Sequence, residues 1–87
     1  MIGKFATSKA GHDKGQLYII TAVEGEYVFL SDGRLKPVEK PKKKRSKHIQ
    51  IINSAVEEPL YNRLMKKETV RNEELKYAIK KYLKQEQ

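Results

Sequence analysis

The chain has 87 residues, with 19 Lys and Arg against 11 Asp and Glu, so its formal net charge is +8. This length allows one domain with a small core, and the charge favours a polyanion as partner, either nucleic acid or an acidic membrane surface. The absence of cysteine excludes disulfides and thiolate metal sites, and two histidines do not make a conventional zinc site. No apolar run approaches the roughly 18–20 residues of a membrane span, and no signal-peptide pattern precedes the first expected strand. We therefore expect a cytoplasmic protein without a metal or cofactor.

The first half of the chain alternates in the manner of β-strands. We predict five short strands, over residues 3–7, 16–23, 27–30, 34–38 and 48–52. The turn signal Glu24–Gly25–Glu26 makes the second and third strands an antiparallel hairpin. A tight turn at Ser31–Asp32–Gly33 precedes the fourth strand, and Pro37 lacks a backbone donor, which places that strand at an edge. Strands this short, joined by tight turns, favour a small barrel. The expected core residues are Leu17, Ile19, Val28, Leu30, Leu35, Ile49 and Ile51.

The pattern changes to a helical period near residue 57, so we divide the chain into a β-rich part, 1–56, and a C-terminal α-helical extension, 57–87. Pro59 fits the first position of a short helix with two leucines spaced four residues apart. Asn72 is the expected N-cap of a longer final helix, whose acidic first turn and basic end agree with the helix dipole. Because an isolated helix of this length is marginal in water, we expect its apolar stripe to dock on the β-rich part or on a protein partner. The stripe consists of Leu75, Ala78, Ile79, Tyr82 and Leu83.

The densest charge feature is the run from Lys40 to His48, which packs six cations into nine residues without an acid. Like charges at this density repel one another and favour an anionic partner. We predict an exposed loop that contacts RNA phosphates, in which Arg45 can grip a phosphate with two donors. A solvated loop is the alternative, and such a string also resembles a nuclear import signal. The candidate RNA contacts in this run are Lys42, Lys43, Lys44, Arg45, Lys47 and His48.

The loop from Ser8 to Gly15 is a second candidate site. Its two glycines allow a backbone geometry in which amides point outward, and such amides, with two lysines beside them, can hold a phosphate. The alternative is a plain glycine-containing loop with solvated lysines. The glycine spacing does not match the phosphate-binding loop of nucleotide-binding proteins. The candidate contacts here are Lys9, Gly11, His12, Lys14 and Gly15.

The chain resembles the KOW motif of several large-subunit ribosomal proteins and some transcription elongation factors. The resemblance lies in Ala10–Gly11–His12–Asp13–Lys14–Gly15 and the alternation Leu17–Tyr18–Ile19–Ile20 that follows. The continuation through Ser31–Asp32–Gly33–Arg34 into the basic run is similar to small bacterial KOW proteins related to eukaryotic and archaeal large-subunit ribosomal proteins. The similarity covers residues 2–53 and implies an SH3-like five-stranded barrel whose loops bind structured RNA. Leu17 departs from the pattern, because many KOW segments carry another glycine there.

Other residues offer weaker signals for RNA contact. Arg34 follows a tight turn, which can hold it in a defined position, although a plain surface arginine is the alternative. Tyr18, Tyr27 and Phe29 can stack on unpaired bases, but aromatic residues on strands more often belong to the core. Histidines in such a chain are more often surface groups than ligands or catalytic bases.

Catalysis finds no support in the pattern, because no serine has a His–acid partner and no groups converge on one substrate atom. We therefore expect a non-enzymatic RNA-binding protein that associates with ribosomal RNA or the ribosome, with phosphate neutralisation as the main source of affinity. The leading alternative is a protein-interaction module that docks an acidic partner in transcription or translation. A membrane surface ranks third, because the basic run lacks interleaved aromatic residues.

Overall fold

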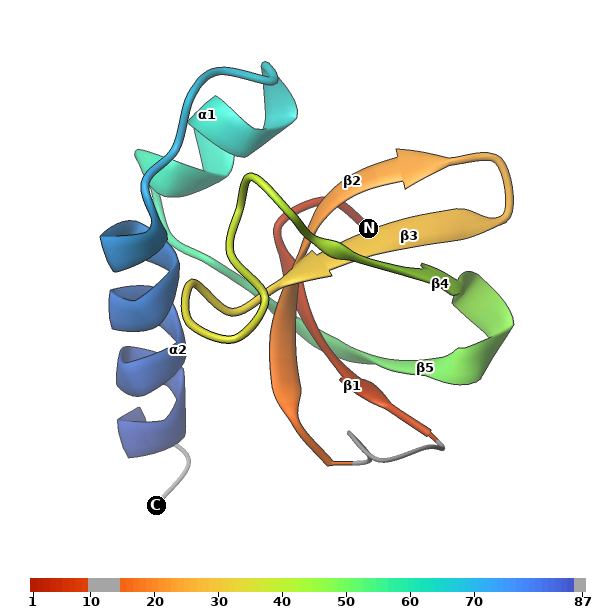
Figure 1. The fold of residues 1–87 in the computed structure, drawn as a ribbon. Coiled ribbons are helices and arrows are strands. Elements are labelled where there is room, and N and C mark those ends of the chain that lie inside the picture. The colour runs from red at the N-terminus through yellow and green to blue at the C-terminus, as the bar shows by residue number, and fades with distance from the viewer. Residues whose placement is uncertain (10–14, 86–87) are drawn as a thin grey trace.

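The computed structural model describes residues 1–9 and 15–85. Within these residues, five strands and a short 3-10 turn precede two helices (Figure 1). The strands are β1 (Lys4–Ser8), β2 (Leu17–Glu24), β3 (Tyr27–Ser31), β4 (Lys42–Arg45) and β5 (Ile49–Ala55). The 3-10 turn η1 spans Ser46–His48, and the helices are α1 (Leu60–Met65) and α2 (Asn72–Gln85).

The strands form one antiparallel sheet in the order β4-β3-β2-β1-β5. The edge strands β4 and β5 are joined directly by η1, so the sheet curls and brings its two edges toward each other (Figure 1). Register shifts between Ile20 and Ala22 on β2 and between Lys4 and Ala6 on β1 are of the kind that bends strands. The predicted mostly β fold with a helical C-terminal segment is confirmed. Closure into a barrel is not, because no ladder joins β4 to β5 among the described residues.

The prediction of a strand over residues 34–38 is wrong, and the prediction that the basic run is a loop is also wrong. Asp32 Oδ1 accepts the backbone N–H groups of Arg34 and Lys36, both at 2.9 Å, so these donors are used inside a local turn. Pro37 has no donor to offer to a ladder. The strand forms later instead, where Lys42–Arg45 pairs with β3.

One hydrophobic core lies on the concave face of the curled sheet. Its buried members are Ala6, Tyr18, Ile20, Val28, Leu30 and Ile49, with Ile51 packed against them. The predicted core is largely confirmed, since Ile19, Val28, Leu30 and Ile49 are buried and Leu17 and Ile51 are partly buried. Leu35 is the exception and is 75% exposed. Its segment forms a turn instead of a strand, so no neighbouring strand covers the side chain.

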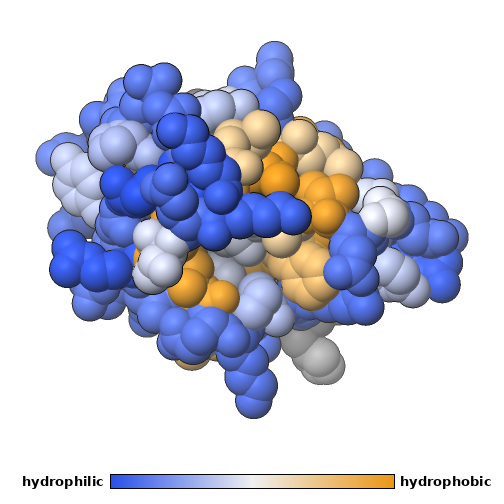
Figure 2. Space-filling view, turned by 90° about the horizontal axis from the view of Figure 1, so that it is seen from above, coloured by the Kyte–Doolittle hydropathy of each residue, from blue (hydrophilic) through white to orange (hydrophobic). Residues whose placement is uncertain are grey.

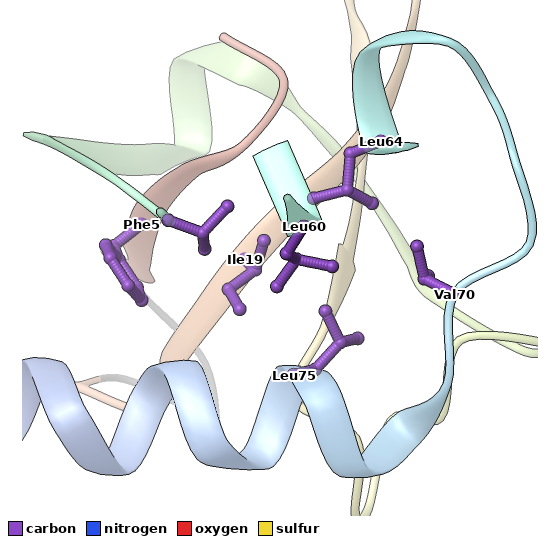
Figure 3. Packing of buried hydrophobic residues seen from close by; sticks show 7 residues of the cluster. Phe5, Ile19, Leu60, Leu64, Val70 and Leu75 are labelled. Carbon is purple, nitrogen blue, oxygen red and sulfur yellow. The ribbon is translucent and has the colours of Figure 1, made fainter. Parts of the chain in front are cut away.

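A second core fills the space between the opposite face of the sheet and the helices (Figure 3). Neighbouring strand residues point to opposite faces, so Phe5 and Ile19 face the helices while Ala6 and Ile20 face the concave core. The buried members of the second core are Phe5, Ile19, Val56, Leu60, Leu64, Val70 and Leu75. Residues from both the β-rich part and the helical segment therefore build one common core.

The apolar stripe of α2 docks on the sheet of the same chain. Leu75 is fully buried, and Ala78, Ile79 and Tyr82 pack against the second core. The ring of Tyr82 stacks on Phe5, with centroids 4.5 Å apart and an interplanar angle of 25°. The sequence left two docking surfaces open for this stripe, and the stripe packs on the β-rich part of the same chain. Leu83 is the exception, because it is 50% exposed.

The start of α2 holds the β3–β4 connection in place. Asn72 Oδ1 accepts the N–H of Val38 at 2.8 Å, and Asn72 Nδ2 donates to the carboxylate of Glu39 at 3.2 Å. The Asn72 side chain thus binds a distant loop, where the sequence predicted a local helix cap. Gly33 packs closely on the same point, because a Cβ there would lie 2.4 Å from the Asn72 carbonyl oxygen.

Candidate nucleic-acid interface

The outer face of β4 carries two of the predicted RNA contacts. Lys43 and Arg45 lie opposite Phe29 and Tyr27 on β3. The Lys43 ammonium is 4.5 Å from the centroid of the Tyr27 ring, and the Arg45 guanidinium carbon is 5.6 Å from it. Arg45 also pairs with Glu26, with a nitrogen–oxygen distance of 3.2 Å. The two cations are exposed and are held over an aromatic surface.

The other two lysines of β4 point to the concave face, because side chains alternate along a strand. Lys42 and Lys44 lie opposite Leu30 and Val28, which belong to the concave core. The Lys44 ammonium donates a hydrogen bond to the hydroxyl of Ser8, a buried residue on β1. The four cations of the strand are therefore divided between two faces and do not form one continuous surface.

The start of the 8–15 loop lies beside the end of the basic run. The Lys9 N–H donates to the His48 carbonyl at 3.0 Å, and the preceding Ser8 pairs with Ile49. Lys9, Lys47 and His48 are all exposed at this end of the sheet. Two segments almost forty residues apart in the sequence are thus brought together.

Gly15 is the last residue of the 8–15 loop and lies within the described part of the chain. Gly15 has a φ of +87°, a conformation that favours glycine, and its N–H lies 3.4 Å from the Ser8 carbonyl oxygen. The predicted contacts Gly11, His12 and Lys14 lie outside the described residues. The structure therefore describes where this loop starts and ends.

Arg34 is not part of this cluster. It lies in the exposed turn after β3, next to Gly33, which contacts the first residue of α2. Figure 1 shows this turn beside α2, whereas β4 and η1 lie on the opposite side of the molecule. The predicted contacts therefore divide into a group at β4, η1 and Lys9, and an isolated Arg34.

The surface along α2 has a different electrostatic character. A cavity of about 370 Å³ lies between this helix and the segment after β5. Its lining includes four carboxylates against the two cations Arg71 and Lys81, so it does not suit a phosphate. The carboxylates are those of Glu57, Glu58, Glu73 and Glu74. A hydrogen bond from Lys81 to Glu57, together with the charge of Glu57, raises the pKa of Lys81.

A groove of about 550 Å³ lies on the face of β2 and β3 that turns toward α1. Phe29 lines it from β3, while Leu64, Lys67 and Val70 line it from α1 and the following segment. Seen from above, the molecule shows apolar residues in more than one area, with hydrophilic residues around and between them (Figure 2). The sequence does not predict Lys67 or the groove, because the walls of the groove come from segments that only the tertiary fold brings together.

Within residues 1–9 and 15–85, no group of three or more His, Cys, Asp or Glu is placed to hold a metal ion. In the same residues, no helix has the length and apolar character needed to cross a membrane. A scan against models of known protein families found no match, and a search of curated proteins found no relative. The KOW resemblance therefore rests on the sequence segments quoted above.

Proposed function

We propose that the protein is a non-enzymatic RNA-binding protein whose phosphate contacts come from the side of the sheet that carries β4 and η1. We call this surface the basic edge, and it consists of Lys9, Lys43, Arg45, Lys47 and His48. The observation that supports the proposal most directly is the placement of Lys43 and Arg45 over the Tyr27 ring. The hydrogen bond from Lys9 to His48 adds a further cation at the end of η1. Cations held by a rigid strand lose less freedom on binding than cations in a loop.

The fold features agree with the family resemblance. We propose that the curled sheet is an SH3-like barrel of the KOW type, in which η1 links the two edge strands. The strand order, the antiparallel pairing and the positive φ of Gly15 at the end of the motif support this assignment. In this proposal the protein acts in the cytoplasm, and its partner is ribosomal RNA or the ribosome.

The alternative, a module that docks an acidic protein, has less support. Most of the apolar stripe of α2 is already packed within the chain, and Leu83 is the stripe residue that stays exposed. The exposed edge of the sheet at β4 is rich in lysine, and lysine on an edge strand opposes the addition of another strand. RNA binding requires neither the apolar face of α2 nor the unpaired edge of β4, because RNA phosphates need only accessible cations.

Fluorescence anisotropy with a labelled ribosomal RNA fragment at several salt concentrations tests the proposal. If about four to six phosphates are neutralised, log K should fall against log[salt] with a slope of roughly −3 to −5. The double variant Lys43→Ser/Arg45→Ser should weaken binding by about tenfold or more. The matched control is Lys76→Ser/Lys80→Ser, which removes the same charge from exposed positions on α2. Equal losses for both variants would show that net charge alone is responsible, and a slope near zero would exclude the phosphate-driven interface.

A further inference from the structure

The groove next to β3 lies close to the basic edge, and Phe29 connects the two. The Phe29 ring lines the groove, and the Lys43 ammonium lies 5.9 Å from its centroid. Tyr27 and Phe29 are two residues apart on one strand, so they share a face at a spacing of about 6.6–6.8 Å. An aromatic ring at the wall of an apolar groove, with a cation beside it, matches the shape and charge of a nucleotide.

Lys67, on the rim of the groove, has an unusual backbone conformation. Its φ of +58° makes it the only non-glycine residue with positive φ in the described part of the chain. The N–H of Lys67 donates to Leu64 at 3.1 Å, and that of Glu68 donates to Arg63 at 2.9 Å, the two bonds of a Schellman motif. Glycine is the usual residue at this position, because any side chain is strained there.

The helix cap requires the positive φ, and strained positions occupied by a residue other than glycine cluster at binding and active sites. Lys67 is exposed and lines the groove beside one acid, Glu68, so the groove has a cation for a ligand that enters there. A cation at the rim and an aromatic ring on the wall are the two groups needed to hold a base and its phosphate. Paired bases in a duplex are stacked on each other and cannot enter such a groove.

We propose that this groove binds an unpaired nucleobase of the RNA, with Phe29 as the stacking surface and Lys67 and Lys43 as contacts to the adjoining phosphates. This inference rests on the proposed RNA binding. It specifies which kind of RNA is bound, namely a single-stranded segment or a loop with an unpaired nucleotide. On one side of the bound base, the adjoining phosphates contact Lys43, which belongs to the basic edge. Single strands should therefore bind more tightly than duplexes of the same length.

The first test compares a labelled oligoadenylate of about twelve nucleotides with an RNA duplex of similar length. Phe29→Leu keeps an apolar side chain but removes the aromatic face, and it should weaken single-strand binding by about tenfold without changing duplex binding. Tyr77→Leu is the matched control, because Tyr77 is 68% exposed on α2 and does not line the groove. If Phe29→Leu binds both RNAs like the parent, the groove proposal fails while RNA binding stands. If neither RNA binds the parent, both proposals fail.

The second test remains decisive even if Phe29→Leu does not fold. Lys67→Gly removes the backbone strain, so it should raise the melting temperature by about 4 °C while it weakens single-strand binding by about fivefold. Lys66→Ser is the control, since Lys66 is exposed but does not line the groove. If Lys67→Gly and Lys66→Ser bind the single-stranded RNA equally well, Lys67 is not a contact of the groove and the proposal is wrong. A parent protein whose dimerisation in sedimentation experiments is abolished by Phe29→Leu would also overturn it, because a second copy would then fill the groove.

Discussion

The ammonium of Lys44 donates a hydrogen bond to the hydroxyl of Ser8 and so links the edge strand β4 to β1 across the concave face of the sheet. Ser8 is only 3% exposed, so the bond lies close to the core. This lysine helps to hold the curl of the sheet, whereas the neighbouring Lys43 faces outward over Tyr27. Adjacent residues of one basic run therefore have different tasks.

The first prediction separates these two tasks. Lys44→Met keeps the aliphatic stem but removes the hydrogen bond to Ser8, so it should lower the free energy of unfolding by about 1 kcal/mol. Lys43→Met should leave stability nearly unchanged and weaken RNA binding. Urea denaturation and RNA titration of both variants check this. A Lys44→Met protein as stable as the parent would show that the Ser8 bond contributes nothing.

The strand at β4 also changes what we expect from replacing the whole basic run. If the run were the exposed loop that the sequence predicts, serine at Lys42, Lys43, Lys44 and Arg45 would leave the fold intact. Since the run pairs with β3 and its stems cover neighbouring side chains, we now expect a loss of stability together with the loss of binding. The single substitutions above are therefore the cleaner experiment.

The second prediction concerns two glycines that have positive φ but different surroundings. Gly33→Ala places a Cβ 2.4 Å from the Asn72 carbonyl oxygen and should destabilise the protein by about 3 kcal/mol through strain and displacement of α2. A Cβ at Gly25 meets no atom of the described part of the chain within 4 Å, so only the backbone strain of about 1 kcal/mol remains. Thermal unfolding of both variants gives the comparison. Equal losses would mean that the contact between Gly33 and α2 is unimportant.

The third prediction concerns Gly15 at the end of the KOW-like segment. Gly15→Val should lower stability by about 1–2 kcal/mol through its φ of +87°, and it should also weaken RNA binding. Gly15→Asn should lower stability less than Gly15→Val does, because asparagine tolerates positive φ better than most other residues. Among the described residues, nothing lies within 4 Å of a Cβ built at this position, so crowding by them does not contribute. Melting and RNA titration decide the matter, and a Gly15→Val protein equal to the parent in both would exclude a shaped phosphate loop.

The fourth prediction concerns pH. Because Glu57 raises the pKa of Lys81 in the folded protein, the pair stabilises the fold below the ordinary lysine value of 10.5 and loses this effect as the pH rises through the folded pKa. The pair is exposed to solvent, so the effect is small. Melting curves of the parent and Lys81→Met should differ slightly at neutral pH and converge in alkaline solution. A gap that widens as the pH rises would contradict this account.

Much of the fold is predictable from local patterns. The alternation in β2 and β3, the turn at Gly25 and the stripe of α2 act over a few residues, so the sequence alone determines these elements. The same holds for the positive φ of Gly33, which the short turn after β3 requires. The excess of positive charge, and with it the preference for a polyanion, also follows from composition alone.

The tertiary structure decided the location of β4 and the division of its lysines between two faces. A lysine-rich segment has no intrinsic strand pattern. It becomes a strand because β3 offers an unpaired edge, while Arg34 and Lys36 use their donors locally and Pro37 has none. The approach of Lys9 to His48, and the groove between Phe29 and Lys67, likewise depend on contacts between distant segments. Such contacts form only when the whole sheet curls and the helices pack on it, so no local pattern in the chain could reveal them.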